Sequence, residues 1–273
     1  MCYTLMALML LLSNINALSW SKLGHRTVVE IAERHLSDGA RIIISRLFPD
    51  GLANESSWMD AHRRDKEYAY TGSYHTMAMN HEYVYDPSWR ISAGGDCVTG
   101  LGFVDYSLTN REKLGLSDST LVLYVRMLIH IVGDMHCPCH CYVMPEKNHW
   151  PCTFRGSEMR CHSFYDHTPE FLYGEKDAKV VAAELDCSTS GYLGVEDGSF
   201  IDWAQECCTR SGRIYDITPY GYRSITESTL EATRPIVEES LLTAGLRLAY
   251  LLNRYFCPED SHGTQTESFH MYS

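Results

Sequence analysis

The sequence contains no apolar run long enough to cross a membrane and has few alternating apolar and polar stretches. Its apolar run near the N-terminus covers only Leu5 to Leu12, and no later segment reaches the roughly 18 uninterrupted apolar residues of a membrane helix. Because the alternation that half-buried strands need is scarce, we expect an all-α fold in one main domain, with long loops and disulfide bonds.

Positive charge is also scarce. The chain has 23 Lys and Arg residues against 35 Asp and Glu residues, so its formal net charge is −12. This balance argues against binding of nucleic acid through a basic surface. It does not exclude binding of phosphates through metal ions, because a bound cation supplies positive charge locally. Two metal-binding residue types are abundant instead, with 13 His and 11 Cys.

The N-terminus has the pattern of a secretory signal. Polar residues and then small residues at Ala17 and Ser19 follow the short apolar run, which predicts a signal peptide over 1–19 cleaved after Ser19. An uncleaved anchor is the alternative. We expect a secreted or lumenal protein with one main domain over 20–257 and a polar tail over 258–273. The sequon at Asn54 predicts a glycoprotein.

Ten cysteines remain after removal of Cys2, and an even number in a secreted chain predicts disulfide bonds. The pairing does not follow from the sequence. Three of these cysteines bracket His140, so their thiolates could bind zinc there; we favour disulfide bonds, with Cys152 and Cys161 as nearby partners. The adjacent Cys207 and Cys208 cannot readily bond to each other.

Apolar residues recur at helical spacing in several segments. They predict helices near 28–36, 37–47, 118–135, 162–172, 176–185 and 227–256. Ser37 and Ser117 are plausible N-caps. We expect irregular structure over 68–100, 141–160 and 186–220.

Histidine and aspartate occur in a pattern that packing does not require. His130 and Asp134 lie four residues apart in the middle of an apolar helix, and His162 and Asp166 repeat that spacing. A buried carboxylate without a partner is costly, and a divalent cation removes that cost. Either pair alone is more often an ordinary hydrogen bond within a helix than a metal site. Two pairs and the nearby His140 favour a metal site, for which zinc suits the ligand types.

Trp20 adds an unusual ligand. If the signal is cut after Ser19, Trp20 carries a free α-amine, which can chelate a metal together with its own carbonyl oxygen. His25 follows five residues later, within reach of the same ion.

In this order the residues resemble the zinc-dependent, single-strand-specific nucleases of fungi, plants and protozoa. That family includes the mung-bean-type enzymes and the class I nuclease/3′-nucleotidases, and it shares the zinc phospholipase C fold. The resemblance is carried by Trp20-Ser-Lys-Leu-Gly24-His25, Trp58-Met-Asp60-Ala-His-Arg63, Tyr74-His75, His130-Ile-Val-Gly-Asp134-Met-His136-Cys-Pro138-Cys-His140, His162-Ser-Phe-Tyr-Asp166 and Ala244-Gly-Leu-Arg-Leu-Ala249-Tyr-Leu-Leu-Asn253.

The resemblance implies a site with three zinc ions. The first ion would be held by Asp60, His75, His130 and Asp134, and the second by His140, His162 and Asp166. The third would be held by the amine and carbonyl of Trp20, by His25 and by the shared Asp134. A metal-activated hydroxide would attack the phosphate, Asp60 would orient the attacking water and Arg63 would stabilise the transition state.

The resemblance also implies the substrates. They would be single-stranded DNA and RNA, cut to 5′-phosphate products, and 3′-nucleotides, from which the phosphate is removed. The protein would act as a monomer. Bases would stack on aromatic residues, for which Tyr74, Tyr142 and Phe164 are candidates because they flank ligands; aromatic residues beside metal ligands more often simply pack in the core. His62, His81, His136, His149 and His167 are interpreted as structural or surface residues.

The chain departs from the family pattern in three places. The loop from Cys141 to Cys152 lacks the usual Gly-Gly-Asn, Thr76 stands where some members have an aromatic residue, and Arg160-Cys161 replaces Asn-Leu. These departures leave two alternatives. One is a zinc phospholipase C, against which the Trp20-to-His25 spacing and Asp166 argue. The other is a non-catalytic zinc-binding protein, against which the presence of Asp60 and Arg63 argues.

Overall fold

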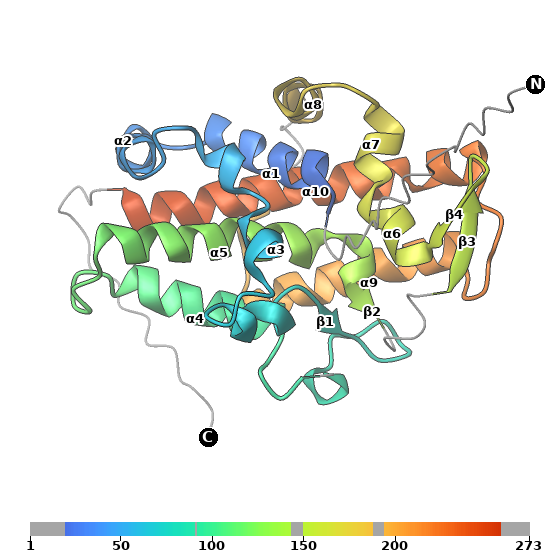
Figure 1. Ribbon diagram of the computed structural model, residues 1–273, viewed down its shortest axis with the longest axis horizontal. Coiled ribbons are helices and arrows are strands. Elements are labelled where there is room, and N and C mark those ends of the chain that lie inside the picture. The colour runs from blue at the N-terminus through green and yellow to red at the C-terminus, as the bar shows by residue number, and fades with distance from the viewer. Residues whose placement is uncertain (1–19, 91, 143–149, 188–193, 258–273) are drawn as a thin grey trace, which may run out of the picture.

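Two long antiparallel helices and the shorter helices around them form the body of the molecule in the computed structural model, which describes residues 20–90, 92–142, 150–187 and 194–257. The long helices are α5 (Asp118–His136) and α10 (Glu227–Phe256). Around them lie α1 (Lys22–Arg34), α2 (Asp38–Leu47), α4 (Cys97–Thr109), α8 (Ala178–Leu185) and α9 (Phe200–Ile217) (Figure 1). The predicted all-α class is confirmed.

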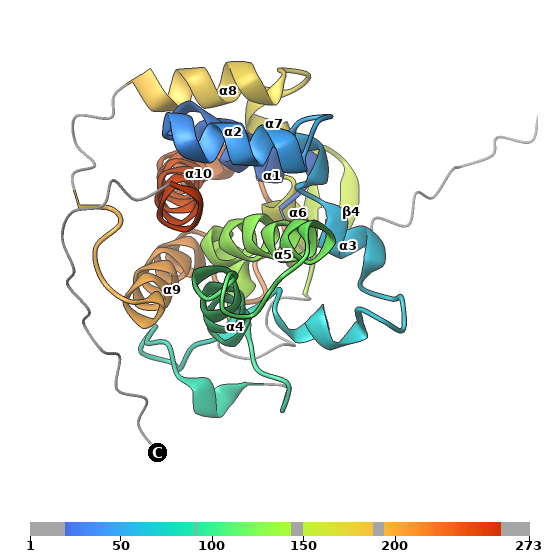
Figure 2. The same cartoon turned by 90° about the vertical axis from the view of Figure 1, so that its left-hand side faces the viewer.

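The end-on view shows how the main core is enclosed (Figure 2). In that view α1 and α10 lie on one side of α5, and α4 and α9 lie on the other. The facing sides of these helices supply the main hydrophobic cluster, with fully buried residues such as Val29, Leu128 and Leu248. Helix α1 packs closely on α10 because Gly245 has no side chain: a β-carbon there would lie 2.4 Å from Cγ2 of Ile31.

Helix starts follow local sequence signals. Side chains of Ser37, Ser117, Ser199 and Thr226 each accept a hydrogen bond from a backbone N–H of the first turn of the helix that follows. At Ser199 and Thr226 the third helical residue bonds back to the cap, which completes a capping box. These caps fix where α2, α5, α9 and α10 begin.

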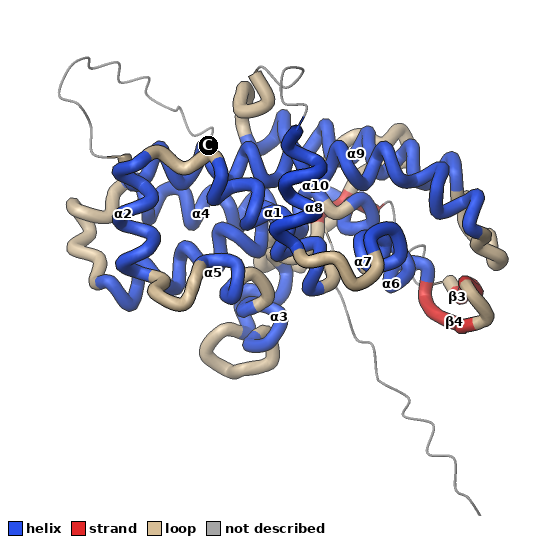
Figure 3. Tube along the Cα trace, turned by 90° about the horizontal axis from the view of Figure 1, so that it is seen from above, coloured by secondary structure: helices blue, strands red, loops and turns tan. Residues whose placement is uncertain are grey.

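Short elements connect the helices near one end of α5. They are η1 (Leu52–Glu55), α3 (Trp58–His62), η2 (Ala69–Ser73), η3 (Pro87–Trp89), η4 (Pro138–His140), α6 (Cys161–Asp166) and α7 (Thr168–Tyr173). Strand β1 (Met77–Ala78) pairs in parallel with β2 (Cys141–Tyr142), and β3 (Pro151–Phe154) pairs antiparallel with β4 (Ser157–Arg160). Seen from above, the β3–β4 hairpin lies at one end of the molecule (Figure 3).

Four predictions about local structure are corrected. Part of the segment 141–160 is the β3–β4 hairpin, closed by Arg155 and Gly156, both of which have positive φ angles. Helix α9 lies within 186–220, and α4 begins inside 68–100, at Cys97. The predicted helix 162–172 is two helices, because the first ends at Asp166 and Pro169 lies in the first turn of the second.

Two further expectations concern cysteines and the membrane. The predicted disulfide bonds are not confirmed by the structure, although two pairs of thiols make direct side-chain contacts: Cys141 with Cys208, and Cys152 with Cys161. No helix among the described residues is long and apolar enough to cross a membrane. The predicted signal peptide and polar tail lie outside the described residues.

Candidate metal centre

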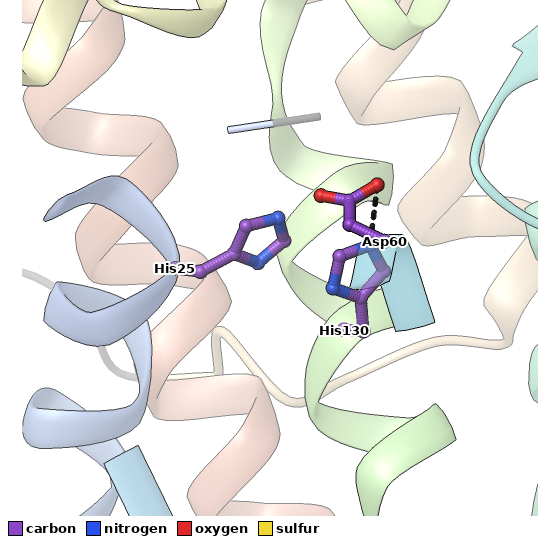
Figure 4. A group of neighbouring side chains, drawn as sticks. All are labelled: His25, Asp60 and His130. Carbon is purple, nitrogen blue, oxygen red and sulfur yellow. Dashed lines mark ion pairs between the residues drawn. The ribbon is translucent and has the colours of Figure 1, made fainter. Parts of the chain in front are cut away.

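The predicted ligands come from separate parts of the chain and meet beside the C-terminal half of α5. His25 lies on α1, Asp60 on α3 and His75 just after η2. His130 and Asp134 lie on α5, His140 lies on η4, and His162 and Asp166 lie on α6. Figure 4 shows His25, Asp60 and His130 pointing toward one another from three helices, with Oδ1 of Asp60 3.8 Å from Nε2 of His130.

Asp134 is the centre of this cluster and is fully buried. Its Oδ2 atom lies 2.8 Å from Nδ1 of His75 and 3.1 Å from Nε2 of His130. Its Oδ1 atom lies 3.3 Å from Nε2 of His25 and 3.4 Å from Nδ1 of His140. One carboxylate therefore contacts four imidazoles, an arrangement that suits a carboxylate shared between two cations.

Asp166 organises a neighbouring group. Its Oδ1 atom lies 3.3 Å from Nε2 of His140, and its Oδ2 atom lies 3.5 Å from Nε2 of His162. The rings of His140 and His162 are stacked, with centroids 5.0 Å apart. Because His140 contacts both aspartates, the two groups are continuous.

Backbone carbonyls orient two of the histidines. Nδ1 of His130 donates a hydrogen bond to the carbonyl of Ser56 at 2.8 Å, and Nδ1 of His140 donates to the carbonyl of His75 at 2.6 Å. Such bonds orient the rings so that Nε2 faces the carboxylates, which is how metal-binding histidines are usually held.

Trp20 lies beside the group of residues around Asp166. Its side chain is 1% exposed, and the next residue, Ser21, donates its backbone N–H to the carbonyl of Asp166 at 2.8 Å. Glu170 on α7 accepts hydrogen bonds from the hydroxyl of Ser21 and from the backbone N–H of Leu23. The start of the described chain is thus fixed beside α6.

The pKa values follow from burial and opposed charge. Burial alone lowers the pKa of His130, but Asp134 and Asp60 outweigh it and raise the pKa to about 9. Burial likewise lowers the pKa of His140, but Asp134 outweighs it and raises the pKa to about 9. Burial raises the pKa of Asp166 to about 7, whereas His130 and His140 hold the pKa of Asp134 well below its ordinary value despite burial.

Buried polar atoms that lack a hydrogen bond indicate that these residues fit a metal ion. Within the described residues, both ring nitrogens of His25, Oδ1 of Asp134 and Oδ2 of Asp166 are buried without a hydrogen bond. Leaving such atoms unsatisfied is costly, and a divalent cation satisfies several of them at once. Imidazole nitrogens mixed with carboxylate oxygens are the donor set that zinc accepts.

A cavity of about 730 Å³ opens beside the cluster and is lined by His75, His162 and Arg63 among others. Asp60 is the most exposed of the clustered carboxylates, with 26% of its side chain accessible, and its Oδ1 atom lies 3.8 Å from a guanidinium nitrogen of Arg63. The centre is therefore closed on the α5 side and accessible at Asp60.

The lining of the cavity distinguishes among the aromatic residues that are candidates for base stacking. Tyr74 and Thr76 line it. Phe164 does not: it is fully buried and packs against Phe154 and Phe171, so of the two interpretations packing in the core holds for this residue. The side chain of Tyr142 lies outside what the structure describes.

Two polar residues of the cavity are not indicated by any sequence motif. Arg90 and the buried Asp96 line it, and Asp96 accepts a hydrogen bond from the hydroxyl of Tyr85 at 2.7 Å. They lie between motifs, in a segment rich in Gly and Ser, and only the fold brings them to the site.

The histidine at 136 has a structural role. Its Nδ1 donates to the carbonyl of Val132 at 2.8 Å, and its Nε2 lies 3.0 Å from a guanidinium nitrogen of Arg247. Burial and the nearby Arg247 lower the pKa of His136 well below its ordinary value. His136 is therefore neutral and is held by these two bonds rather than by the aspartates.

Comparison with known proteins covers nearly the whole described chain. Residues 20–257 match the family model for S1/P1 nuclease. Endonuclease 4 of Arabidopsis thaliana is 27% identical over 287 residues, with 90% of this chain and 92% of that protein covered. Endonuclease 5 of the same plant is 25% identical, with 88% and 91% covered, and Nuclease S1 of Aspergillus oryzae is 22% identical, with 86% and 91% covered.

Proposed function

The chain belongs to the S1/P1 nuclease family, whose members are metal-dependent hydrolases of phosphodiester bonds, and from this premise we propose that it is a secreted zinc endonuclease. Its substrates are single-stranded DNA and RNA, cut to 5′-phosphate products. It also removes phosphate from 3′-nucleotides, because the same bond between phosphorus and the 3′ oxygen is cleaved in both cases. The observation that carries this proposal is the contact of one buried carboxylate, Asp134, with four histidines.

The proposed centre holds three zinc ions. The ligand sets are Asp60, His75, His130 and Asp134 for the first; His140, His162 and Asp166 for the second; and Trp20, His25 and Asp134 for the third. The short distances from Asp134 and Asp166 to the histidines support these sets. Bound zinc supplies a Lewis acid for the phosphoryl oxygens and lowers the pKa of the water that it binds.

Two residues at the accessible side of the cluster have proposed roles in the reaction. Asp60 accepts a hydrogen bond from the attacking water and so orients it toward phosphorus. Arg63 donates from its planar guanidinium to the oxygens that gain negative charge in the transition state. The 3.8 Å distance between Oδ1 of Asp60 and the guanidinium, and the position of Arg63 on the cavity wall, support this assignment.

The shape of the site supports a single-stranded substrate. The cavity of about 730 Å³ has the size of a small-molecule site, so it accommodates one splayed nucleotide rather than a base-paired duplex. A base can leave the stack readily only in a single strand, where the ring of Tyr74 offers it a face. Arg90 places a second positive charge on the cavity wall, where it can pair with a neighbouring phosphate.

Secretion follows from the proposed ligand role of Trp20. Its amine is available to a metal only after cleavage following Ser19. The support is local: the side chain of Trp20 is buried, and Ser21 is anchored to Asp166 and Glu170.

The test is made on protein secreted from a eukaryotic host. Zinc per chain is counted, the N-terminus is sequenced, and single-stranded DNA, RNA and a 3′-mononucleotide are offered with and without a chelator. We expect Trp20 at the terminus, about three zinc ions, and 5′-phosphate products whose formation the chelator abolishes. Zinc without hydrolysis of any of these substrates contradicts the proposal, and phosphatidylcholine hydrolysis identifies a phospholipase C instead.

A pair of adjacent arginines provides a matched control. Arg63→Ala is expected to lower kcat by about 10²–10³-fold with zinc content unchanged, because a donor to the transition state is lost. Arg64→Ala, which removes an exposed neighbour, is expected to leave kcat and zinc content unchanged. Equal activity of the two variants contradicts the role of Arg63.

A further inference from the structure

One buried thiol lies among the metal ligands. Cys137 follows the last residue of α5 and precedes η4, and its side chain is fully buried. Its Sγ atom lies 3.9 Å from Oδ1 of Asp166, the same oxygen that Nε2 of His140 approaches at 3.3 Å. The ligand atoms of Cys137, His140 and Asp166 all lie within 4.8 Å of one another.

These distances are close to those within a zinc site. With zinc–nitrogen and zinc–oxygen bonds near 2.0 Å and zinc–sulfur bonds near 2.3 Å, tetrahedral geometry separates the ligand atoms by about 3.3–3.6 Å. The distances from Asp166 to His140, to His162 and to Cys137 are 3.3, 3.5 and 3.9 Å. Oδ1 of Asp166 makes the contacts with His140 and Cys137, and Oδ2 makes the contact with His162. Binding therefore needs small movements of these side chains, including an approach of the thiol to Asp166 by a few tenths of an ångström.

Disulfide bonding does not account for this thiol. Direct thiol–thiol contacts join Cys141 to Cys208 and Cys152 to Cys161, and neither contact includes Cys137. The side-chain contact of Cys137 is with the carboxylate of Asp166. Of the cysteines around His140, it is the one grouped with metal-binding side chains.

We propose that Cys137 is a fourth protein ligand of the zinc ion held by His140, His162 and Asp166. This inference rests on the proposed function for the presence of that ion. Binding forms a zinc–sulfur bond and releases the thiol proton to solvent. One thiolate and one carboxylate then balance the two positive charges of the ion, whereas two histidines and one carboxylate leave a net positive charge in a buried site.

The consequence is that the zinc ions of the centre have different roles. Four protein ligands close a tetrahedral zinc site, and closed sites are structural rather than catalytic. This zinc then ties η4 to α6, while the accessible carboxylate of the centre, Asp60, lies beside Arg63 on the cavity wall.

The test reads the zinc ligands directly. X-ray absorption is measured on the zinc-loaded wild-type protein, whose zinc content and nuclease activity are determined on the same sample. We expect a sulfur contribution near 2.3 Å, equivalent to one sulfur shared among the bound ions. A loaded, active protein whose zinc has only nitrogen and oxygen neighbours overturns the role of Cys137 and leaves the nuclease function intact. A protein that binds no zinc overturns both.

Cobalt substitution assigns the sulfur to one residue. The cobalt-loaded protein is expected to show a sulfur-to-cobalt charge-transfer band in the near ultraviolet, which Cys137→Ser removes. Cys139→Ser, a change of the same kind two residues away in the same turn, is expected to keep the band. A band that survives Cys137→Ser, or that only Cys139→Ser removes, overturns the assignment. If Cys137→Ser does not fold, the measurement on wild-type zinc still decides.

Discussion

The imidazole of His25 lies directly against the backbone of Gly133, one residue before the central Asp134. A β-carbon added at position 133 would lie 2.6 Å from Nδ1 of His25 and 2.9 Å from its Cε1. Contacts this short do not occur between unbonded atoms. The absence of a side chain at Gly133 is therefore what lets α1 bring His25 to within 3.3 Å of Asp134.

We expect Gly133→Ala to push the ring of His25 away from Asp134. Helix propensity alone favours alanine, so a loss must come from the displaced imidazole. Zinc affinity is expected to fall by about 10–100-fold, as for other changes that misplace a ligand, and nuclease activity to fall with it. Zinc per chain after dialysis against graded chelator measures the change.

The control is another helical glycine. Gly102 lies on α4, is exposed and has no atom within 4 Å of an added β-carbon. Gly102→Ala is expected to keep zinc content and activity, and to raise stability by about 0.5–1 kcal/mol through helix propensity. If Gly133→Ala behaves in the same way, His25 does not depend on this contact.

Asp134→Asn tests whether this carboxylate is shared between two ions. The amide keeps the shape but removes the charge that faces the imidazoles of His25, His75 and His130. We expect two of three zinc ions to be lost together, measured by elemental analysis. Asp118→Asn, an exposed change at the other end of α5, is expected to keep all three. Retention of three ions by Asp134→Asn refutes the bridging role.

The long helices are well predicted from the sequence because their signals are local. The apolar spacing predicts helices over 118–135 and 227–256, which agree closely with α5 and α10, and the predicted cap Ser117 is confirmed. Helix α9 is not predicted because it lies in a segment whose Gly and Ser content favours a loop, although its buried face is periodic and includes Trp203, Ala204 and Ile214. The hairpin does have a local signal, since Arg155-Gly156 forms its two-residue turn.

The candidate site likewise has features that the sequence predicts and features that depend on how the helices pack. The spacing of four between His130 and Asp134 predicts that both lie on one face of a helix, and both lie on the buried face of α5. The approach of His25 to Asp134 does not follow from the sequence, because that contact depends on how α1 packs across α5. Nor does the position of Arg90 on the cavity wall, since this residue lies between motifs.

An extra residue before Trp20 tests the N-terminal ligand. The extension converts the chelating amine into an amide, which is a poor metal ligand, and it adds bulk beside Asp166, to whose carbonyl Ser21 is bonded. We expect about one zinc ion less per chain and lower activity, read by elemental analysis and by release of 5′-nucleotides. A protein beginning at Trp20 is the control. Unchanged zinc and activity remove Trp20 from the site.

The contacting thiols predict two disulfide bonds in the secreted protein. Cys141 contacts Cys208, and Cys152 contacts Cys161. With glutathione disulfide as oxidant, each pair loses two electrons and two protons to form one bond and two glutathione molecules. In a chain-entropy model the bond between Cys152 and Cys161 stabilises the fold by about 2–3 kcal/mol. Non-reducing peptide mapping is expected to find these two links, and a link from any of these four cysteines to a different cysteine contradicts the pairing.

The carboxylate of Asp186, at the end of α8, joins that helix to the end of α1 and gives a pH-dependent contribution to stability. Burial alone raises its pKa, but hydrogen bonds from Arg34 and His35 outweigh burial and hold the pKa of Asp186 below its ordinary value. A carboxylate with a lowered folded-state pKa stabilises the fold above the unfolded-state value, about 3.9, and that contribution is lost as the pH falls through the folded-state pKa. Asp186→Asn is therefore expected to lower the unfolding free energy by about 1–2 kcal/mol at neutral pH, with the exposed Arg34 limiting the loss, and by less below pH ~3.

Urea unfolding at the two pH values measures this change in unfolding free energy. Glu184→Gln on the same helix is the control, since the pair of Glu184 with Lys176 is about half exposed. An effect of Asp186→Asn that is equal at both pH values shows that the carboxylate charge contributes nothing.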